Sequence, residues 1–492
     1  MKLSTLFPPE GISGTIAPDA VEVFGASVHT DKIKTGDLFI AKRGAHTDPL
    51  SLLDTVVERG AAAILTARGT EIPATLPLPV FFAEDLAGAS CHVFDALYGY
   101  PARSLRLFAV TGTNGKTTVA QILSHLFSAS GVPCGYIGTL GASLEGVTLD
   151  TAGGTMTTPE PDALFPLLCK MKQRGALAVV MEVSSHALAL GRVKTLAFES
   201  AIFTNLTEDH LDFHKDMESY YLAKQALFSQ SELAVVNVDD AYGERLAAHL
   251  ADRGGRVCRV GAIQAADYRL SEWYENGLES TKYLYCSPYN EFFVEYPLYG
   301  AFNAYNTLLA VTAAIKAGLC PEEIRHALLS LPKPRGRAEV LSLPLPFTVI
   351  IDYAHTPDAM EKVIRATRRQ TRGKLFVLFG AGGDREKEKR PFMGRIAEEL
   401  ADFAVVSTDN PRSEAREDIF ADILSGMSHP DKYTVIPDRA AAICWTLDRM
   451  QEDDVLLLLG KGHEEYLIED GQSVPFSERT VIENYVKRKR LL

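Results

Sequence analysis

The stretch Leu107-Phe-Ala-Val-Thr-Gly-Thr-Asn-Gly-Lys-Thr-Thr118 decides the fold of the middle of this chain. It reads as a buried strand, then a tight glycine-bearing turn, then a segment of helical period over Val119–Ser130. Backbone N–H groups of such a turn converge on phosphate oxygens, and the helix N-terminus adds positive potential. The longer form of this motif has its first glycine where this chain has Val110, so the match is to a shorter form. The alternative interpretation is a chance Gly-rich turn. The predicted phosphate-binding residues are Gly112, Thr113, Asn114, Gly115, Lys116, Thr117 and Thr118.

Short apolar runs recur along the chain and alternate with longer segments of helical period. The runs are Leu107–Val110, Ala178–Met181, Ala201–Phe203, Val349–Ile351, Leu375–Phe379, Ala404–Ser407 and Val455–Leu459. This alternation predicts an α/β fold with mostly parallel sheets and crossover helices. The segment Gly261–Pro297 alternates loosely and predicts further strands. Most runs end in a polar segment, and open α/β sheets bind ligands beyond the carboxyl ends of their strands.

Three domains are expected for 492 residues, at about 150 residues per domain. Breaks in composition at Tyr98–Ser104 and at the Pro/Gly/basic stretch Leu331–Arg337 divide the chain accordingly. The predicted domains are residues 1–104, 105–334 and 335–492. We expect an N-terminal α/β domain, a central phosphate-loop ATPase domain and a C-terminal Rossmann-like domain.

Composition excludes several classes of protein. The net charge of -13 argues against a nucleic-acid partner, because such proteins are normally basic. No run approaches the roughly 20 apolar residues that span a bilayer, and the N-terminus lacks the features of a signal peptide. The seven cysteines are scattered without a C-x-x-C, as in a cytosolic protein with reduced thiols. We therefore expect a cytoplasmic protein without a membrane partner.

Two strand ends after the phosphate loop carry acidic groups. The run Ala178–Met181 ends in Glu182, which suits a Mg²⁺ ligand, although an isolated carboxylate at a strand end is often simply solvated. The run Ala201–Phe203 leads into a loop whose seven residues from Glu208 to His214 include three acids and two histidines. The alternative for this loop is an ordinary polar surface segment.

Five motifs, in this order, resemble the Mur ligases, which are ATP-dependent amino-acid ligases of peptidoglycan precursor synthesis. They are TGTNGKTT (111–118), MEVSSHAL (181–188), TNLTEDHLDFH (204–214), FNAYN (302–306) and DYAHTPD (352–358). The resemblance covers residues 105–480 and implies a role in cell-wall formation, cell shape and cell division. TTPE (157–160), DNPR (409–412) and GKGHE (460–464) resemble the third-step members, which add a diamino acid to UDP-N-acetylmuramoyl-L-alanyl-D-glutamate. Folylpolyglutamate synthases share the loop and part of the core.

The resemblance implies a catalytic set of Lys116, Glu182, His210 and Lys224, with Mg²⁺ as cofactor and ATP as co-substrate. Thr117, Glu182, His210 and Lys224 would hold the metal. Lys224 matches a lysine that the family carries as a carbamate (N6-carboxylysine), which supplies anionic oxygens beside Mg²⁺ where an ammonium would be repelled. By spacing alone, Lys224 is an exposed helical lysine.

The resemblance also assigns two groups of substrate contacts. Asn303 and Asn306, three apart in a predicted helix over Ala301–Ala317, would hold the adenine side of ATP, with helix capping as the alternative. Arg337 and Asp352 would reach its phosphate and ribose. The muramoyl precursor would contact Thr30, Thr157, Thr158, Ser184 and Arg192, although these hydroxyls could equally be loop caps. The first domain departs from the family at His29-Thr-Asp31, where Asp-Ser-Arg is usual.

Three strand ends in the last domain are expected to converge on the incoming amino acid. An amino acid with a second carboxylate and a second ammonium needs a guanidinium and an anionic partner. The predicted contacts are Arg390, Asp409, Asn410, Pro411, Arg412, Gly460 and Glu464. In the family, D-N-P-R accompanies meso-diaminopimelate. The other interpretation of the Gly-rich stretches, as further phosphate loops, lacks Lys-Ser/Thr in register.

The expected reaction is ATP-dependent formation of an acyl phosphate on the D-glutamyl γ-carboxylate, followed by attack of the diamino acid. Lysine or ornithine as the amino acid, or a folylpolyglutamate-type reaction, are alternatives within ligases. A nucleotide-dependent switch is an alternative from another class, but a switch needs no second substrate site. For His355, assistance in the reaction and the role of an ordinary buried histidine are the two alternatives. We expect a monomer.

Overall fold

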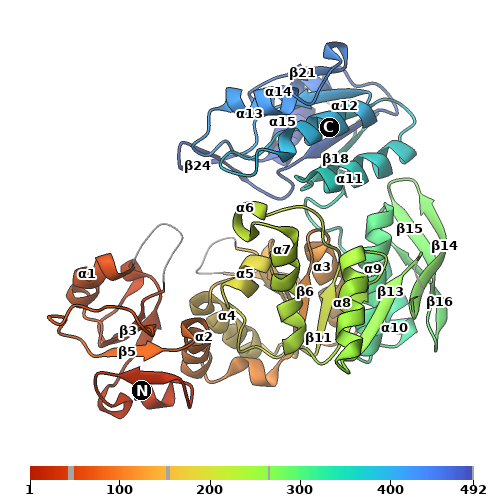
Figure 1. The fold of residues 1–492 in the computed structure, drawn as a ribbon. Coiled ribbons are helices and arrows are strands. Elements are labelled where there is room, and N and C mark those ends of the chain that lie inside the picture. The colour runs from red at the N-terminus through yellow and green to blue at the C-terminus, as the bar shows by residue number, and fades with distance from the viewer. Residues whose placement is uncertain (43–48, 151–155, 264–265, 490–492) are drawn as a thin grey trace. The chain divides into compact units, whose positions relative to one another are not determined.

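The computed structural model describes residues 1–42, 49–150, 156–263 and 266–489 (Figure 1). These residues form two compact units, each assembled from separated stretches of chain. The first unit comprises Met1–Thr111, Gly131–Ile202 and Ala223–Ala234, and the second comprises Gly112–Ser130, Phe203–Leu222 and Val235–Leu492. The α/β class with mostly parallel pairing is confirmed, and the division into three domains stays a prediction.

The first unit begins with a five-stranded sheet in the order β1-β5-β4-β3-β2. Strands β2 to β5 pair in parallel, and β1 joins β5 in antiparallel fashion. The elements are β1 (Ile12–Gly14), β2 (Gly25–Ser27), β3 (Asp37–Ile40), α1 (Leu53–Glu58), β4 (Ala63–Ala67), β5 (Val80–Ala83) and α2 (Leu86–Leu97). Phe39, Val56 and Ile64 form part of the core between this sheet and α1.

A second group of strands in the first unit contains two of the predicted apolar runs. Strand β10 lies between β6 and β7 and is parallel to both, while β8 and β9 continue from β7 in antiparallel fashion. Every residue of β10 is buried, including Glu182 at its end. The elements are β6 (Arg106–Thr111), β7 (Cys134–Gly138), β8 (Gly141–Leu144), β9 (Val147–Leu149), α4 (Pro161–Gln173), β10 (Ala178–Glu182) and α5 (Ser185–Ala189).

In the second unit, α3 (Lys116–Ala129) packs against α9 (Ala301–Lys316) and α10 (Pro321–Leu329). Helix α3 begins three residues before the predicted start, because Gly115 adopts a φ of 86° and forms its N-cap. The strands predicted over Gly261–Pro297 are confirmed, and β14, β15 and β16 pair in antiparallel fashion. The other elements are α6 (Leu211–His214), α8 (Ala241–Asp252), β13 (Val257–Gly261), β14 (Tyr268–Asn276), β15 (Ser280–Cys286) and β16 (Glu291–Tyr296). Residues of both units occur in β11 (Ser200–Phe203), α7 (Met217–Gln225) and β12 (Ala234–Asn237).

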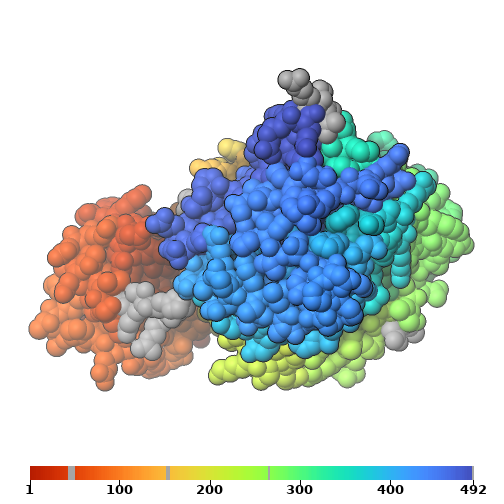
Figure 2. All heavy atoms as spheres, turned by 90° about the horizontal axis from the view of Figure 1, so that it is seen from above, coloured from red at the N-terminus to blue at the C-terminus, as the bar shows by residue number. Residues whose placement is uncertain are grey.

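The chain after residue 335 forms a six-stranded sheet in the order β17-β18-β22-β19-β20-β21. All pairs are parallel except β17 with β18. Alternate residues of the central strands face opposite sides: Leu457 lies in a core with α11, α12 and α13, and Leu456 in a core with α14 and α15. This two-sided cover gives the predicted Rossmann-like architecture. In the space-filling view the chain after residue 335, coloured cyan to dark blue, forms a continuous face (Figure 2).

The elements of this last region complete the fold. They are β17 (Glu339–Val340), β18 (Thr348–Asp352), α11 (Pro357–Gln370), β19 (Leu375–Phe379), α12 (Lys389–Leu400), β20 (Phe403–Val406), α13 (Arg416–Leu424), β21 (Tyr433–Val435), α14 (Arg439–Leu447), β22 (Val455–Leu459), β23 (Tyr466–Glu469), β24 (Gln472–Pro475) and α15 (Glu478–Arg488). Among the described residues, no helix combines the length and the apolar character needed to cross a membrane.

Candidate functional site

The phosphate loop between β6 and α3 needs two of its glycines for space and for backbone conformation. Gly112 has a φ of 145°, and a Cβ there would lie 1.9 Å from the hydroxyl oxygen of Thr204. Gly115 has a φ of 86°, and a Cβ there would lie 2.3 Å from Oδ1 of Asn306. Larger residues at either position would require both an unfavourable backbone and a displaced neighbour. The fold of this turn therefore requires both glycines, and phosphate binding by the loop stays a prediction.

The segment that follows β11 braces this loop through side chains that the sequence alone did not assign. Thr204 donates a hydrogen bond to the carbonyl of Asn114 at 2.6 Å, and Asn205 exchanges two hydrogen bonds with Asn114, at 3.0 and 3.1 Å. The hydroxyl of Thr113 donates to the carbonyl of Thr207 at 3.1 Å and accepts from its N–H at 3.0 Å. The TNLT stretch therefore holds the loop in shape.

Lys116 and Thr117 both make contacts at the mouth of the loop. The ammonium of Lys116 donates to the carbonyls of Gly112 and Thr113 at 2.9 and 2.8 Å, so it lies over the loop backbone. The hydroxyl of Thr117 accepts a hydrogen bond of 3.0 Å from Arg337. The structure thus places the predicted Arg337 beside the phosphate loop.

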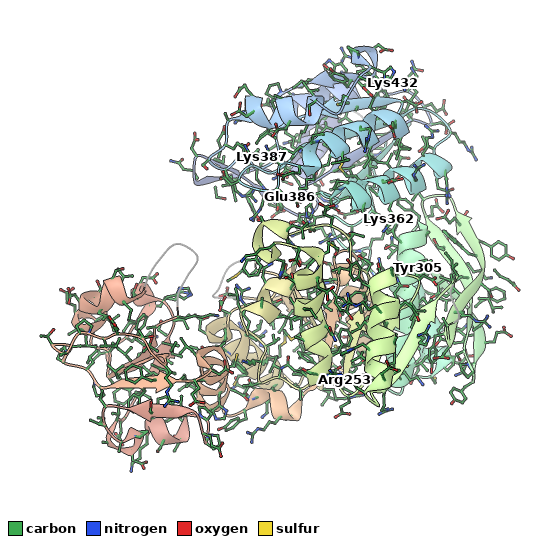
Figure 3. The ribbon with its side chains drawn as sticks, in the orientation of Figure 1. Arg253, Tyr305, Lys362, Glu386, Lys387 and Lys432 are labelled. Atoms are coloured by element: carbon green, nitrogen blue, oxygen red, sulfur yellow. The ribbon has the colours of Figure 1, made fainter. Side chains whose placement is uncertain are left out.

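Asn303 and Asn306 lie on one buried face of α9, as their spacing predicts. Asn306 donates to Oδ1 of Asn303 at 3.2 Å, and Asn303 donates to the carbonyl of Tyr299 at 2.9 Å. The capping alternative is wrong, because Gly300 is the N-cap of α9 and both asparagines lie inside the helix. Asn306 instead meets the phosphate loop at Gly115. Beside it on α9, Tyr305 donates to Asp239 at 2.7 Å (Figure 3).

Asp352 ends β18, and both of its oxygens are engaged by main chain. They accept hydrogen bonds from the N–H groups of Ala338 and Ala354, at 2.6 and 2.7 Å. Burial raises the pKa of this carboxyl, and the nearby charge of Arg337 opposes the rise. The guanidinium of Arg337 lies 4.6 Å from the ring centroid of Tyr353. This carboxylate therefore orders the segment that carries Arg337.

Another link joins the phosphate loop to α11. The side-chain amide of Asn114 donates to Asp358 at 3.2 Å, and Lys362 forms an ion pair with Asp358 at 2.8 Å (Figure 3). Asp358 belongs to the DYAHTPD motif, so this motif and the phosphate loop are in contact. His355 of the same motif is half-buried, and its Nδ1 lies 2.9 Å from the carbonyl of Tyr353. Burial lowers the pKa of His355.

His210 lies at the start of α6 with a φ of 58°. Its Nε2 is 3.4 Å from the carboxylate of Asp209, which is buried. Burial alone would raise the pKa of Asp209, but electrostatic interactions, first with His210 and then with His355, lower it overall. The ring of His210 lies 6.3 Å from that of Tyr220, whose hydroxyl contacts Thr113 at 3.2 Å.

In the first unit, Glu182 is fully buried and accepts hydrogen bonds from Tyr136 and Thr139. Its Oε1 accepts from the hydroxyl of Tyr136 at 2.6 Å and from the N–H of Thr139 at 3.0 Å, and its Oε2 accepts from the hydroxyl of Thr139 at 3.0 Å. The solvated-carboxylate alternative is wrong for this residue. Gly138 makes room for the carboxylate, because a Cβ there would lie 2.2 Å from Oε1.

The predicted precursor contacts of the TTPE stretch are largely brought together, also in the first unit. Thr158 donates to the carbonyl of Glu182 at 2.9 Å and accepts from the N–H of Ser184 at 3.0 Å. Ser184 also caps α5 by accepting from Ala187, so the loop-cap alternative holds for this hydroxyl. Thr157 lies 3.1 Å from the hydroxyl of Thr139.

Arg192 belongs to a charged cluster that the sequence did not reveal. Its Nη1 donates to the carbonyl of Thr158 at 3.0 Å, and its Nε lies 2.5 Å from Glu160. Lys42 approaches the other oxygen of Glu160 at 3.2 Å. Thr30 lies in a short 3-10 helix after His29, whose ring is 3.7 Å from Asp162. Lys42 and Glu160 are 118 positions apart, so no sequence pattern links them.

Lys224 in α7 is 1% exposed, so its description as an exposed helical lysine is wrong. A buried ammonium is costly unless it is compensated. The predicted metal ligands offer carboxylate and hydroxyl oxygens in Glu182 and Thr117, which suits a hard cation such as Mg²⁺. Within the described ranges, no group of three or more His, Cys, Asp and Glu side chains is arranged to hold a metal.

In the last region, the loops after β20 and β22 meet as predicted. Asn410 donates to Glu464 at 2.8 Å, and the fully buried Lys461 donates to both, at 3.1 Å each. Gly460 has a φ of 105°, and a Cβ there would lie 2.4 Å from Asp409. Lys461 was not predicted, although it stands between Gly460 and Glu464 in the same motif.

Arg412 reaches across to the loop after β19, which is the third predicted strand end. Its Nη1 donates to the carbonyl of Gly383 at 2.5 Å, and its backbone is bonded to Ile468 and Asp470 of the β23–β24 hairpin. Burial lowers the pKa of Arg412, as does the charge of Arg385. A carboxylate arriving between these two guanidinium groups would relieve their repulsion.

Arg390 is different, because its guanidinium is used within the protein. It is fully buried and donates to Glu414 through Nη1 and Nη2 at 2.8 Å each, to Asp422 at 2.8 Å and to the carbonyl of Gly382 at 3.1 Å. The hydrogen bonds from Arg390 hold the pKa of Glu414 well below its ordinary value. The prediction that Arg390 binds an incoming carboxylate finds no support in these contacts, and Arg390 instead anchors the loop after β19. Glu386 and Lys387 occupy that loop (Figure 3).

The glycine loop, the strand-end carboxylates and the mostly parallel α/β sheets define a phosphate-loop protein with a Rossmann-like region. The sequence matches the Mur ligase middle domain over residues 110–314 and the Mur ligase glutamate ligase domain over residues 336–462. The chain belongs to the Mur ligase family. The fold-class and family predictions are thereby confirmed.

Two relatives are similar over nearly their whole length, and both are called UDP-N-acetylmuramoyl-L-alanyl-D-glutamate--2,6-diaminopimelate ligase. The protein of Pseudomonas aeruginosa is 42% identical over 451 residues, covering 91% of each chain. The Clostridium acetobutylicum protein, whose name carries the number 1, is 37% identical over 470 residues, covering 95% of each chain. A solved structure of a ligase with the same name is 28% identical, with a TM-score of 0.69, and covers 100% of this chain and 99% of its own. A folylpolyglutamate synthase of Mycobacterium tuberculosis, at 18% identity and a TM-score of 0.62, shares the fold.

Proposed function

We propose that this chain is an ATP-dependent ligase that joins meso-2,6-diaminopimelate to the D-glutamyl γ-carboxylate of UDP-N-acetylmuramoyl-L-alanyl-D-glutamate. One observation carries the choice of amino acid: Asn410 and Glu464 are hydrogen-bonded to each other, and Arg412 follows Asn410 by two residues. A guanidinium and a carboxylate are thus presented by two connected loops. They match the carboxylate and the ammonium at the far end of a diamino acid.

The proposed reaction has two steps. The γ-carboxylate attacks the γ-phosphorus of ATP, ADP leaves, and an acyl phosphate forms. The free amine of the diamino acid then attacks the acyl carbon, and inorganic phosphate leaves as the amide bond forms. Activation is needed because a carboxylate does not acylate an amine in neutral water.

Residues of the phosphate loop have separate tasks in this proposal. The backbone of Gly112 to Thr118 cradles the phosphates, and Lys116 swings from the carbonyls that it now contacts to neutralise charge on the transferred phosphoryl group. Asn303 and Asn306 receive the adenine side, and Arg337 approaches the phosphates because it already contacts Thr117. Asp352 holds the segment from which Arg337 extends, and we keep it as the proposed ribose contact.

Mg²⁺, when bound, would polarise the transferred phosphoryl group and neutralise its charge. We propose Thr117, Glu182, His210 and Lys224 as the residues that hold it, on the chemistry of their donor atoms. Lys224 would carry a carbamate on its buried amine, which exchanges a buried cation for an oxygen ligand. Lys116, Glu182, His210 and Lys224 remain the proposed catalytic set.

The other substrate contacts are proposed as follows. The diamino-acid site consists of Arg412, Glu464, Asp409, Asn410, Pro411 and Gly460. Arg390 stabilises this site through its hydrogen bonds to Gly382 and Glu414. The precursor site uses Thr30, Thr157, Thr158, Ser184 and Arg192, joined by Lys42 and Glu160. Both substrates and ATP are small molecules, and the protein would act as a monomer in the cytoplasm, built from domains over residues 1–104, 105–334 and 335–492.

The testing experiment offers purified protein ATP, Mg²⁺ and the UDP-muramoyl dipeptide, with diaminopimelate, lysine or ornithine in separate reactions. Phosphate release is the readout. The proposal expects turnover with diaminopimelate at a kcat/KM far above those for lysine and ornithine. Preference for lysine or ornithine would replace the amino acid, and turnover with none of the three would refute the proposed function.

A further inference from the structure

Arg439 is a buried arginine that donates hydrogen bonds to the main chain where both loops of the proposed diamino-acid site begin. It is the first residue of α14 and its side chain is 0% exposed. Its Nη1 donates to the carbonyl of Thr408 at 3.1 Å, and its Nη2 donates to the carbonyl of Leu459 at 2.7 Å. Asp409 follows the first carbonyl, and Gly460 follows the second.

The two carbonyls belong to strand ends that are not neighbours in the sheet. Thr408 follows β20 and Leu459 ends β22, while β19 lies between these strands. Strands β20 and β22 each pair with β19 rather than with each other. The guanidinium of Arg439 joins the two loops directly through both carbonyls, and its donors have a fixed separation and direction.

Glu478 fixes the guanidinium in turn. This residue begins α15, is 2% exposed, and accepts from Nε of Arg439 at 2.9 Å and pairs with Nη2 at 2.7 Å. Four acceptor contacts on one fully buried side chain leave it a single orientation. The ion pair also compensates the buried charge, which would otherwise be costly.

The position of Arg439 affects the contact between the two loops. Asn410 donates to Glu464 at 2.8 Å, and Lys461 bridges the same two side chains. These groups lie two to five residues beyond the carbonyls that Arg439 holds. A shift of about 1 Å at the carbonyls would separate the guanidinium and carboxylate that receive the amino acid, and such shifts are costly in a preorganised site.

We propose that Arg439 is a positioning residue of the diamino-acid site: by holding the carbonyls of Thr408 and Leu459, it sets the spacing of the loops that carry Arg412 and Glu464. The inference rests on the proposed function, since it assigns the amino acid to these loops. Arg439 would act through these loops and not through contact with substrate or ATP.

The test compares Arg439→Lys with Arg449→Lys, in the full chain. Lysine keeps the buried charge but cannot donate in two fixed directions. Arg449 is an exposed arginine two residues past the end of α14, and it donates to the carbonyl of Trp445 at 3.0 Å. Two quantities are measured for each variant: the KM values for diaminopimelate and ATP, and acyl-phosphate formation without amino acid, trapped by hydroxylamine as a hydroxamate.

For Arg439→Lys, the KM for diaminopimelate should rise about tenfold or more, equivalent to about 1.4 kcal/mol. The KM for ATP and the yield of hydroxamate should stay within about twofold, because only the second substrate site is displaced. Arg449→Lys should change none of these values. Equal losses in all of them, or no change in any, would overturn the inference.

A second variant decides the question if Arg439→Lys does not fold. Glu478→Asp keeps the ion pair, but its shorter side chain draws the guanidinium back by one methylene. The KM for diaminopimelate should therefore rise about threefold, and the KM for ATP should not change. Absence of this split would overturn the inference. If the wild type turns over lysine or ornithine instead, the same comparison is made with that amino acid. If it turns over none, the proposed function fails and the inference falls with it.

Discussion

Replacing Gly115 by alanine tests the account of the phosphate loop, because the structure separates the two costs of that change. Gly115 has a φ of 86°, and the added Cβ would lie 2.3 Å from Oδ1 of Asn306. Gly131 provides a matched control close to the other end of α3. It has a φ of 81°, and nothing lies within 4 Å of an added Cβ.

The magnitudes follow from these two positions. Alanine in the left-handed region costs roughly 1–2 kcal/mol, and this is the whole expected effect of Gly131→Ala. Gly115→Ala must also displace Asn306, whose buried hydrogen bond to Asn303 at 3.2 Å would break. Losing that bond adds roughly 1–3 kcal/mol, so the total is roughly 2–5 kcal/mol.

The assay is urea denaturation of both variants, together with the KM for ATP. Gly115→Ala should raise that KM about tenfold or more, because the loop that cradles phosphate is displaced, whereas Gly131→Ala should leave it unchanged. In Gly115→Ala/Asn306→Ala the clash is gone, so the alanine at position 115 should cost no more than the one at position 131. Equal destabilisation by the two single variants would show that Asn306 does not restrict position 115.

Three further outcomes are expected. Arg412→Lys should raise the KM for diaminopimelate about tenfold and leave that for ATP unchanged, since lysine cannot form a bidentate pair; equal changes would show that Arg412 does not bind the amino acid. Lys224→Ala should abolish turnover, with partial recovery in a short carboxylic acid, and normal activity would remove the carbamate. Burial and Arg103 lower the pKa of His92 below 6.5, so the unfolded chain binds this proton more readily. The free energy of unfolding should then fall as pH drops through 6.5, and it should fall less steeply in His92→Gln. Identical pH profiles of the wild type and the variant would contradict this.

Features with a local cause could be predicted from the sequence. The run Leu107–Val110 became β6, and Ala178–Met181 became β10 with Glu182 at its end, because an apolar run followed by a polar turn dictates its own structure. The spacing of Asn303 and Asn306 likewise placed both on one helical face. The contact between the DNPR and GKGHE loops followed from the rule that parallel strands end at one edge.

Features that depend on distant partners could not be predicted. Arg390 resembled any basic loop residue, and its partners Glu414 and Asp422 are 24 and 32 positions away. Lys224 shows no sign of burial in its helix, because burial depends on what covers the helix. The bracing of the phosphate loop by Thr204 and the pairing of Lys42 with Glu160 also arise only once the chain is folded.

Mass spectrometry of a single reaction can show whether phosphoryl transfer from ATP drives capture of a carboxyl group by a diamino acid. The protein is incubated with ATP, Mg²⁺, the UDP-muramoyl dipeptide and diaminopimelate, and ADP and the muramoyl tripeptide are quantified over time. The two products should appear in equal amounts. When diaminopimelate is withheld, no tripeptide should form, and ADP should not exceed about one equivalent per enzyme. ADP accumulating without tripeptide, or tripeptide forming without ADP, would contradict it.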